Sequence, residues 1–480
     1  MSFASIDFLV FFALVLLVIS LSALPSLERA AQGKMPEWRQ GFLLVCSYIF
    51  YGWWDARFCI LMLALTVSAY YSAQKLEKGR QARHRKGYLA LGVGGPLLVL
   101  GFFKYFNFFL ASACDLLGTE QLGTLNIILP VGISFYTFQS LSYVIDVYRG
   151  KYPAEKSFLK IALYIAFFPQ LVAGPIVKAG DFLPQLAQDR KPTRQGVSTG
   201  LQIFLFGMFK KIVLADHLSV FVDDVFAAPT AFSTLTVWWA VISYSFQIYF
   251  DFSGYSDMAI GCAKILGYDL SCNFNLPYLA KNVSEFWKRW HISLSSWLQE
   301  YLYFSLGGNR TGNLYANLLL TMLLGGLWHG ASWTFVAWGA LHGTALCIHK
   351  LYLRRRRAVR QTKLVNIVSA FSTYIFVSLC WVLFRADSFL SAAKVYYQLF
   401  SFRSGINQPY AWTFVTLILF AGAVLCAVVR SKKLGLKSVE GFYYSADLRK
   451  FWPLVLFFTV IGLTIGFAYT GSNPFIYFQF

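Results

Sequence analysis

The chain has 480 residues, of which 57% are apolar, 19% are aromatic and only 13% carry a formal charge. That charged fraction is about half of what a soluble domain carries, and apolar residues run from end to end, so the sequence predicts a single integral membrane domain over residues 1–480. The net charge of +20 lies in short Lys and Arg runs between apolar stretches, a pattern that indicates membrane lipid headgroups as the partner and excludes nucleic acid.

Apolar stretches that could cross a bilayer, each needing roughly 20 residues, recur along the whole chain. The first lacks the basic leader of a cleavable signal, so we expect it to be a membrane span. The pattern predicts an all-α polytopic membrane protein with about ten to twelve membrane helices. In chain order, the expected spans are 8–27, 41–54 (short), 58–74, 87–114, 122–145, 161–177, 196–215, 232–250, 311–348 (double length), 364–384, 405–429 and 451–470.

Basic residues gather in the connections 75–86, 350–363 and 430–450, whereas the link near Asp115 has none. An excess of Lys and Arg marks cytoplasmic loops, so we expect these three connections inside the cell. The basic residues after the first span, Arg29 and Lys34 among them, would also lie inside. The N-terminus is then expected outside.

The stretch 161–177 does not fit a straight span. Basic residues flank it on both sides, and Pro169, Gly174 and Pro175 would interrupt its helix. A re-entrant segment fits better. Irregular backbone at membrane depth is tolerated only where it is buried in protein or lines a cavity, so this segment indicates a polar interior.

A second unusual segment, 283–306, alternates aromatic and charged residues at helical spacing. It predicts one amphipathic, Trp-rich helix that lies at the cytoplasmic interface or dips into the helix bundle, ended by Gly307 and Gly308. His291 lies on this helix. Alone, it is best interpreted as an aromatic-belt residue.

The double-length stretch 311–348 contains no Asp, Glu, Lys or Arg. A straight helix of this length would be nearly twice as long as the bilayer is thick, so the chain must fold back or break. Gly325, Gly326 and Gly330 mark the place and put His329 at it. An ionisable side chain inside a membrane segment is a functional candidate by default; the alternative is a structural histidine at a helix junction.

Together, His329 and His291 could handle protons for an acyl transfer, because imidazole titrates near neutrality. A third polar cluster spans residues 247–257. There, Asp251 is expected to close a span, with function and structural hydrogen bonding equally open. Ser256 or Asp257 is expected to cap the next helix.

Several signatures are missing. The chain has no P-loop, no G-x-S-x-G elbow, no H-E-x-x-H and no dinucleotide fingerprint. Its eight cysteines are scattered without a C-x-x-C pair, which indicates buried small hydrophobes. We therefore expect no metal and no tightly bound cofactor, and histidine is the best candidate for catalysis.

Six ordered sequence blocks resemble the membrane-bound O-acyltransferase family. The similarity is strongest to the bacterial branch that contains the membrane component of alginate O-acetylation, with the D-alanyl transfer protein of teichoic acid synthesis a more distant relative. The resemblance covers residues 129–343, flanked by peripheral spans over 1–128 and 385–480. The blocks are LPVGISFY with YVIDVY (129–148), FPQLVAGP (168–175), YFDFSGYSDM (249–258), FWKRWHISLS (286–295), LGGNR (306–310) and GGLWHG (325–330).

The resemblance implies a ring of helices around a thin centre, with a tunnel that brings a cytoplasmic acyl thioester, such as acetyl-CoA, to an acceptor. It implies that His329 is the catalytic histidine, as general base or as covalent nucleophile, and that His291 is the second histidine. An extracytoplasmic acetyltransferase partner and the bacterial inner membrane belong to the same picture. The residues expected to contact substrate are Asp251, Ser253, Tyr255, Trp290, Asn309, Arg310 and Trp328.

The expected function is O-acetylation of an extracytoplasmic polysaccharide, with alginate-like uronan, cellulose and peptidoglycan all compatible, as is a D-alanyl or longer acyl group. The alternative from another class is a transporter or flippase for a lipid-linked glycan. No inverted repeat is visible, which disfavours it. A scaffold for the extracytoplasmic transferase is the third possibility.

Overall fold

The structure is a computed structural model that describes residues 1–22, 35–79, 84–119, 123–172, 174–310, 313–355, 362–408, 410–434, 446–471 and 475–476. Throughout these ranges the regular elements are helical, and an isolated bridge pairs Phe232 with Ile406. Arg29, Lys34 and much of the three basic connections lie outside the described residues, as does the side chain of Cys426.

The chain forms two compact units. The first comprises residues 1–204 and 258–271, and the second comprises residues 205–257 and 272–480. Helices α11 and α13 contribute to both.

In the first unit, the helices are α1 (Ile6–Ser22), α3 (Glu37–Gly52), α4 (Arg57–Lys78), α5 (Arg85–Leu100), the π-turn η1 (Gly101–Tyr105), α6 (Phe106–Leu117), α7 (Ile133–Tyr148), α8 (Phe158–Ala166), α9 (Phe168–Leu171) and α10 (Ala179–Ala187). Helix α11 (Arg194–Met208) begins in this unit, and α13 (Thr234–Ile265) ends in it.

In the second unit, the helical elements are the π-turn η2 (Phe209–Ala215), α12 (Asp216–Ala227), the short turns η3 (Pro229–Ala231) and η4 (Pro277–Leu279), α14 (Val283–Arg289), α15 (Ile292–Trp297), the π-turn η5 (Leu298–Tyr303), α16 (Leu314–His329), α17 (Trp333–Arg355), α18 (Lys363–Arg385), α19 (Phe389–Phe400), α20 (Ala411–Leu434) and α21 (Phe451–Gly466).

Three helical stretches of the described chain are long and apolar enough to cross a membrane: Arg85–Leu117, Arg194–Ala227 and Lys363–Arg385. Four shorter apolar helices accompany them, at Ile6–Leu21, Leu314–His329, Ala411–Gly422 and Phe451–Gly466. The all-helical prediction is confirmed. The count of ten to twelve spans and the central tunnel stay predictions.

The segment predicted to be re-entrant is broken. Helix α8 ends at Ala166, and the four-residue α9 follows directly with Pro169 in its first turn. The amide of Gln170 caps the break by donating to the Tyr164 carbonyl at 2.6 Å. The prediction of an interrupted helix is therefore confirmed.

The expected span 122–145 is wrong in its first half. Residues 123–130 have no regular secondary structure, and α7 begins only at Ile133. Pro130 has no backbone N–H to donate, so it cannot serve as an interior residue of a longer helix. Gly132 takes a left-handed conformation with φ of 74°. This pair sets the start of α7.

Asp251 does not close a span, and neither Ser256 nor Asp257 caps a helix, because α13 runs without interruption from Thr234 to Ile265. A carboxylate normally favours the N-terminal end of a helix, where it can accept from unpaired backbone N–H groups. Here both aspartates have lysine partners from η2 instead. The helix can therefore carry them in its interior.

The prediction of one amphipathic helix over 283–306 is also wrong, because the segment breaks between α14 and α15 at His291. His291 is left-handed, with φ of 43°. The segment before η4 supplies the partners at the break: the Asn275 N–H donates to the Arg289 carbonyl at 2.9 Å, and the Ile292 N–H donates to the Asn273 carbonyl at 2.9 Å. These long-range bonds replace intrahelical ones.

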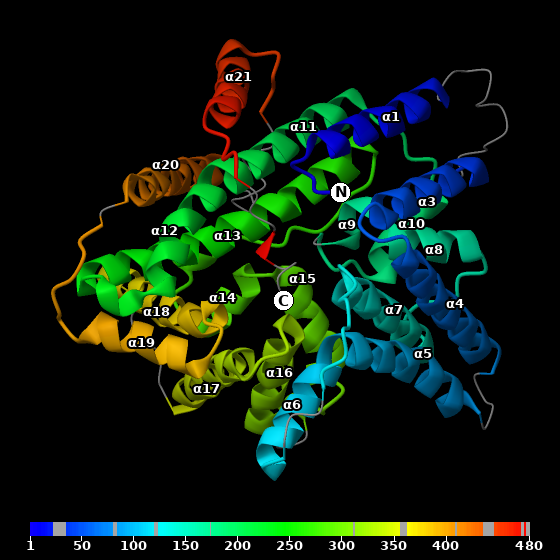
Figure 1. The fold of residues 1–480 in the computed structure, drawn as a ribbon. Coiled ribbons are helices and arrows are strands. Elements are labelled where there is room, and N and C mark those ends of the chain that lie inside the picture. Colours follow the sequence, from blue (N-terminus) through cyan, green and yellow to red (C-terminus); the bar gives the residue numbers. More distant parts are fainter. Residues whose placement is uncertain are drawn as a thin grey trace. The chain divides into compact units, whose positions relative to one another are not determined.

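The predicted fold-back after His329 is confirmed. Helix α16 ends there, and α17 returns beside it as a close hairpin (Figure 1). Gly326 and Gly339 face one another across the hairpin: a Cβ on Gly339 would lie 2.3 Å from the Met322 carbonyl oxygen and 3.3 Å from the Gly326 Cα. Small residues of this kind allow two membrane helices to approach closely.

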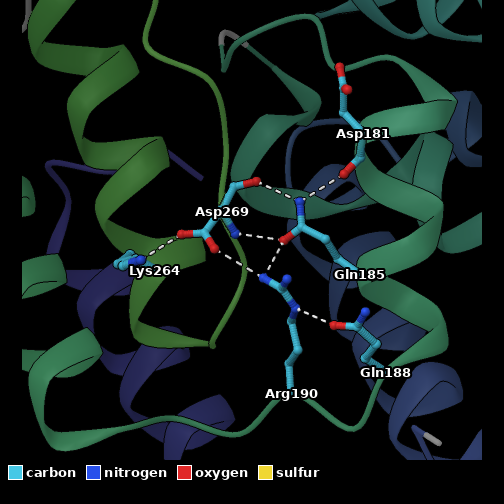
Figure 2. Close-up of polar contacts among 6 residues, drawn as sticks. All are labelled: Asp181, Gln185, Gln188, Arg190, Lys264 and Asp269. Carbon is cyan, nitrogen blue, oxygen red and sulfur yellow. Dashed lines mark hydrogen bonds and ion pairs between the residues drawn. The ribbon is translucent and has the colours of Figure 1, made fainter. Parts of the chain in front are cut away.

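A polar cluster in the first unit ties α10 to the end of α13 (Figure 2). The Gln185 amide donates to the Asp269 carbonyl and accepts from the Asp269 N–H, both at 2.9 Å. The Asp269 carboxylate also pairs with Arg190 at 3.0 Å and with Lys264 at 2.5 Å. Partial burial disfavours the charged carboxylate, but the Lys264 ammonium and the Arg190 guanidinium outweigh it and hold the pKa of Asp269 below its ordinary value.

We expect Gly339→Ala to destabilise the protein by about 1–3 kcal/mol, the usual cost of overpacking, because its Cβ would meet backbone rather than a movable side chain. Thermal unfolding in detergent measures this. Gly94→Ala in α5 is the matched control, since a Cβ added at that position would have nothing within 4 Å. A Gly339→Ala variant as stable as Gly94→Ala would contradict the hairpin.

We expect Asp269→Asn to lower stability at neutral pH by up to about 1 kcal/mol, the range of exposed ion pairs. Because the folded pKa is lowered, the contribution is fully present above the unfolded pKa of about 3.9 and is lost as the pH falls through the folded pKa. Unfolding temperatures from neutral to acid pH should therefore converge for wild type and variant. Asp115→Asn, at an exposed carboxylate in α6, is the control for the substitution itself.

Candidate active site

The histidine predicted to be catalytic is the last residue of α16. His329 is 3% exposed, and aromatic rings surround its imidazole edge to face: Trp328 and Trp338 at 5.1 Å and Phe384 at 5.2 Å between centroids. The tight turn that follows needs Gly330, since a Cβ there would lie 2.2 Å from a phenylalanine ring of α17. The end of the hairpin therefore holds this imidazole in a fixed aromatic surround.

His291 lies beside it, with 6.5 Å between the two ring centroids. It is fully buried, and its Nδ1 is 3.2 Å from the Asn273 side-chain oxygen. An amide oxygen can only accept, so Nδ1 carries a proton and the neutral ring keeps its lone pair on Nε2. The structure thus brings together the two histidines that the sequence singled out.

Asn273 orients His291, and sequence reasoning missed it. Its side-chain oxygen also accepts from the Ser293 hydroxyl at 2.8 Å, and its amide donates to the Ser256 hydroxyl at 3.2 Å. Asn273 stands in an irregular segment, where no periodicity marks a residue. The only signal was a polar side chain placed among apolar neighbours shortly before the histidine block.

Buried charges lie in the same unit. Lys211 pairs with Asp216 at 2.7 Å and with Asp251 at 2.5 Å, and the three side chains are only 8%, 9% and 2% exposed. Its neighbour Lys210 forms an ion pair with Asp257. Two adjacent lysines thus neutralise two aspartates of α13.

The π-turn η2 places these lysines. A π-turn adds one residue to a helical turn and is frequent at functional sites. It packs against α13 at Gly254, where a Cβ would lie 2.7 Å from the Gly207 carbonyl oxygen and 3.1 Å from the Lys211 amide nitrogen. Only a residue without a side chain permits this approach, which brings both lysines within reach of their carboxylates.

The described end of the chain reaches this cluster. The Ile476 N–H donates to the Asp251 carboxylate at 2.9 Å, and the Phe475 ring stacks on Tyr255 with 4.6 Å between centroids. The hydrogen bonds and ion pairs of Asp251 therefore go to Lys211 and Ile476. Neither histidine is hydrogen-bonded to it in the described structure.

Three other residues that the sequence predicts to contact substrate have different neighbours from one another. Trp328 lies against both histidines, with its ring centroid 5.1 Å from that of His329 and 6.0 Å from that of His291. Trp290 packs in an aromatic core against Trp381 at 4.9 Å, and Ser253 accepts from the Lys210 ammonium at 3.4 Å.

Asn309 and Arg310 are exposed just after η5. The Asn309 side chain accepts from the Tyr303 hydroxyl at 2.6 Å, and the Arg310 N–H donates to the Gly307 carbonyl. These bonds are local to the turn. They do not link either residue to the two histidines.

A cavity of about 350 Å³ adjoins the charged cluster. Phe384, which contacts His329, forms part of its wall. Within the described ranges, no group of three or more His, Cys, Asp or Glu side chains could hold a metal ion. The residues around the cavity are Lys211, Ala215, Asp216, Ser219, Asp223, Tyr244, Gln247, Asp251, Ser332, Thr334, Phe335, Phe384, Arg385, Ala386, Asp387 and Ile476.

Comparison with known proteins agrees with the motifs. The sequence model of the membrane-bound O-acyltransferase family, MBOAT, matches residues 153–393. The probable alginate O-acetylase AlgI of Pseudomonas putida is 43% identical over 371 residues, which cover 76% of this chain and 75% of that protein. The chain therefore belongs to the membrane-bound O-acyltransferase family.

Other relatives carry different names. The peptidoglycan O-acetyltransferase of Helicobacter pylori is 39% identical over 393 residues, covering 76% of this chain and 74% of that protein. The teichoic acid D-alanyltransferase of Bacillus subtilis is 24% identical over 278 residues, covering 55% and 70%. The chain is accordingly a membrane protein and an O-acetyltransferase. This family membership favours the enzyme over the transporter or flippase.

We expect Lys211→Met to destabilise the protein by about 3–5 kcal/mol, because it leaves two buried carboxylates without their cation. Detergent-solubilised yield and unfolding temperature measure the loss. The triple variant Lys211→Met, Asp216→Asn, Asp251→Asn removes the charges together and should recover much of the stability. Equal unfolding temperatures for the single and triple variants would show that the charges are not coupled.

Proposed function

We propose that this protein takes an acetyl group from a cytoplasmic thioester donor, acetyl-CoA or a relative of it, and delivers it across the membrane for O-acetylation of an extracytoplasmic polysaccharide. The observation that carries the proposal is the pair of buried imidazoles, His329 and His291, with ring centroids 6.5 Å apart, at a helix turn of a chain that belongs to an acyltransferase family.

The chemistry assigned to His329 balances without a cofactor. Its unprotonated ring nitrogen takes the proton of an acceptor hydroxyl as the oxygen attacks the thioester carbonyl carbon. The carbon–sulfur bond then breaks, and the thiolate leaves with the proton that the imidazolium returns. Such general-base help accelerates a reaction by typically 10²- to 10⁴-fold.

A covalent route uses the same residue. The His329 nitrogen would attack the carbonyl carbon, and the carbon–sulfur bond would break to release the thiolate. The acyl-imidazole would then pass its acyl group to the hydroxyl, whose proton ends on the thiolate as the free imidazole is restored. The two routes differ in one observable. Only the covalent route leaves the acetyl group on the protein when acceptor is withheld.

We assign His291 a role in orienting substrate or in stabilising the oxyanion. Its Nδ1–H is already directed to Asn273, so Nε2 is the atom that can face the reactants. When unprotonated, Nε2 would accept a hydrogen bond from the acceptor hydroxyl and so hold it in place. When protonated, it would donate to the developing oxyanion.

The names of the relatives indicate the class of the acceptor polymer. Alginate and peptidoglycan stand in the names of two relatives, and both are polymers outside the cytoplasm. We propose a role of this kind in exopolysaccharide modification, in the bacterial inner membrane, with an extracytoplasmic acetyltransferase as partner.

We expect His329→Ala to reduce acetyl transfer from radiolabelled acetyl-CoA by at least about 100-fold, the lower limit of general-base catalysis, with the protein still folded. Mass spectrometry of wild type quenched without acceptor distinguishes the covalent route. His349→Ala is the control, because this half-buried histidine at the end of α17 bonds to Ser284 instead. Full turnover by His329→Ala would refute the assignment.

A further inference from the structure

Two of the residues that line the cavity carry a buried side-chain polar atom without a hydrogen-bond partner in the described structure. In the described parts of the chain, the Tyr244 hydroxyl and the Gln247 side-chain oxygen have no hydrogen-bond partner. Both residues line the cavity, and they are only 1% and 7% exposed. They lie three positions apart on α13, so they share one face of the helix.

Leaving a buried polar group unsatisfied costs about 1–3 kcal/mol. The Tyr244 hydroxyl can donate and accept, whereas the Gln247 oxygen only accepts. A ligand that matches both atoms must therefore present donors as well as acceptors at short spacing. Neighbouring hydroxyl groups have this property.

The charges around the cavity disfavour anions. Four carboxylates face two cations there, Lys211 and Arg385, which leaves a formal surplus of two negative charges. Both cations already have carboxylate partners: Lys211 pairs with Asp216 and Asp251, and Arg385 pairs with Asp223 at 2.7 Å. A phosphate or carboxylate entering the cavity would meet repulsion without gaining a new ion pair.

The position and size of the cavity connect it with the proposed chemistry. Phe384 is one of the residues around the cavity, and its ring contacts His329 at 5.2 Å between centroids. The cavity therefore adjoins the aromatic surround of the imidazole. The volume of about 350 Å³ is near the lower end for small-molecule sites, roughly 300–1,000 Å³, and suits one sugar ring.

We propose that this cavity binds an uncharged, hydroxyl-rich acceptor group about the size of one sugar ring, held by Tyr244 and Gln247, and that its acidic lining excludes anionic groups. The inference rests on the proposed function, because it assigns the cavity to the acceptor of that reaction. An acidic polymer such as a uronan would then receive acetyl groups through the partner, without entering this cavity itself.

The test compares two ligands that differ in one group. Methyl glucoside and methyl glucuronoside have the same ring, but only the second carries a carboxylate. Binding to the full-length wild-type protein in detergent, without thioester, is measured by ligand-observed NMR. We expect methyl glucoside to bind at least tenfold more tightly at low salt, with the difference shrinking as salt screens the carboxylates.

Three variants locate the site. Tyr244→Phe combined with Gln247→Leu should weaken methyl glucoside binding at least tenfold. Tyr48→Phe is the matched control, because its hydroxyl in α3 also lacks a partner in the described structure but Tyr48 is not among the residues that line the cavity. Asp387→Asn, at an exposed position of the cavity lining, should improve binding of methyl glucuronoside and leave methyl glucoside unaffected.

Equal binding of the two glycosides, or unchanged binding in the Tyr244 and Gln247 double variant, would overturn the inference. If His329-dependent acetyl transfer persists in that case, the proposed function stands without it. If instead the glycosides behave as expected while His329→Ala retains full transfer, the cavity is a polyol site and the proposed function is wrong.

Discussion

The pairing of buried charges between η2 and α13 is the constraint on which the rest of the second unit depends. Lysines and aspartates in an apolar protein are costly unless each finds a partner. Here Lys211 neutralises Asp251 and Asp216, and Lys210 neutralises Asp257. These pairs allow α13 to continue as a helix through its polar stretch, and they leave a polar cavity next to an aromatic core.

Phe384 belongs to two neighbouring environments. It is one of the residues that line the acid-lined cavity, and it contacts His329, whose aromatic surround also includes Trp328 and Trp338. His291 joins the same surround and is held by Asn273. Reactive groups in an aromatic, water-poor setting interact more strongly with developing charge than they would in water.

Much of this could be predicted where the sequence has a strong local signal. Glycines beside an ionisable residue in an uncharged stretch marked the turn at His329, and Pro169 marked the break after α8. The predictions that were wrong concern positions whose structure depends on contacts from distant parts of the chain. Helix α13 passes through Asp251 because η2 supplies lysines, and the helix breaks at His291 because residues near Asn273 take over its backbone hydrogen bonds. No pattern within either segment contains that information.

The account rests on the His329 imidazole meeting the activated acetyl carbon. The most direct measurement is an electron cryomicroscopy structure of the protein with a non-hydrolysable thioether analogue of acetyl-CoA. We predict that the carbon equivalent to the thioester carbonyl will lie within van der Waals contact of the His329 ring, with His291 facing the same group. An analogue bound elsewhere, with the His329 ring still enclosed by its aromatic neighbours, would contradict it.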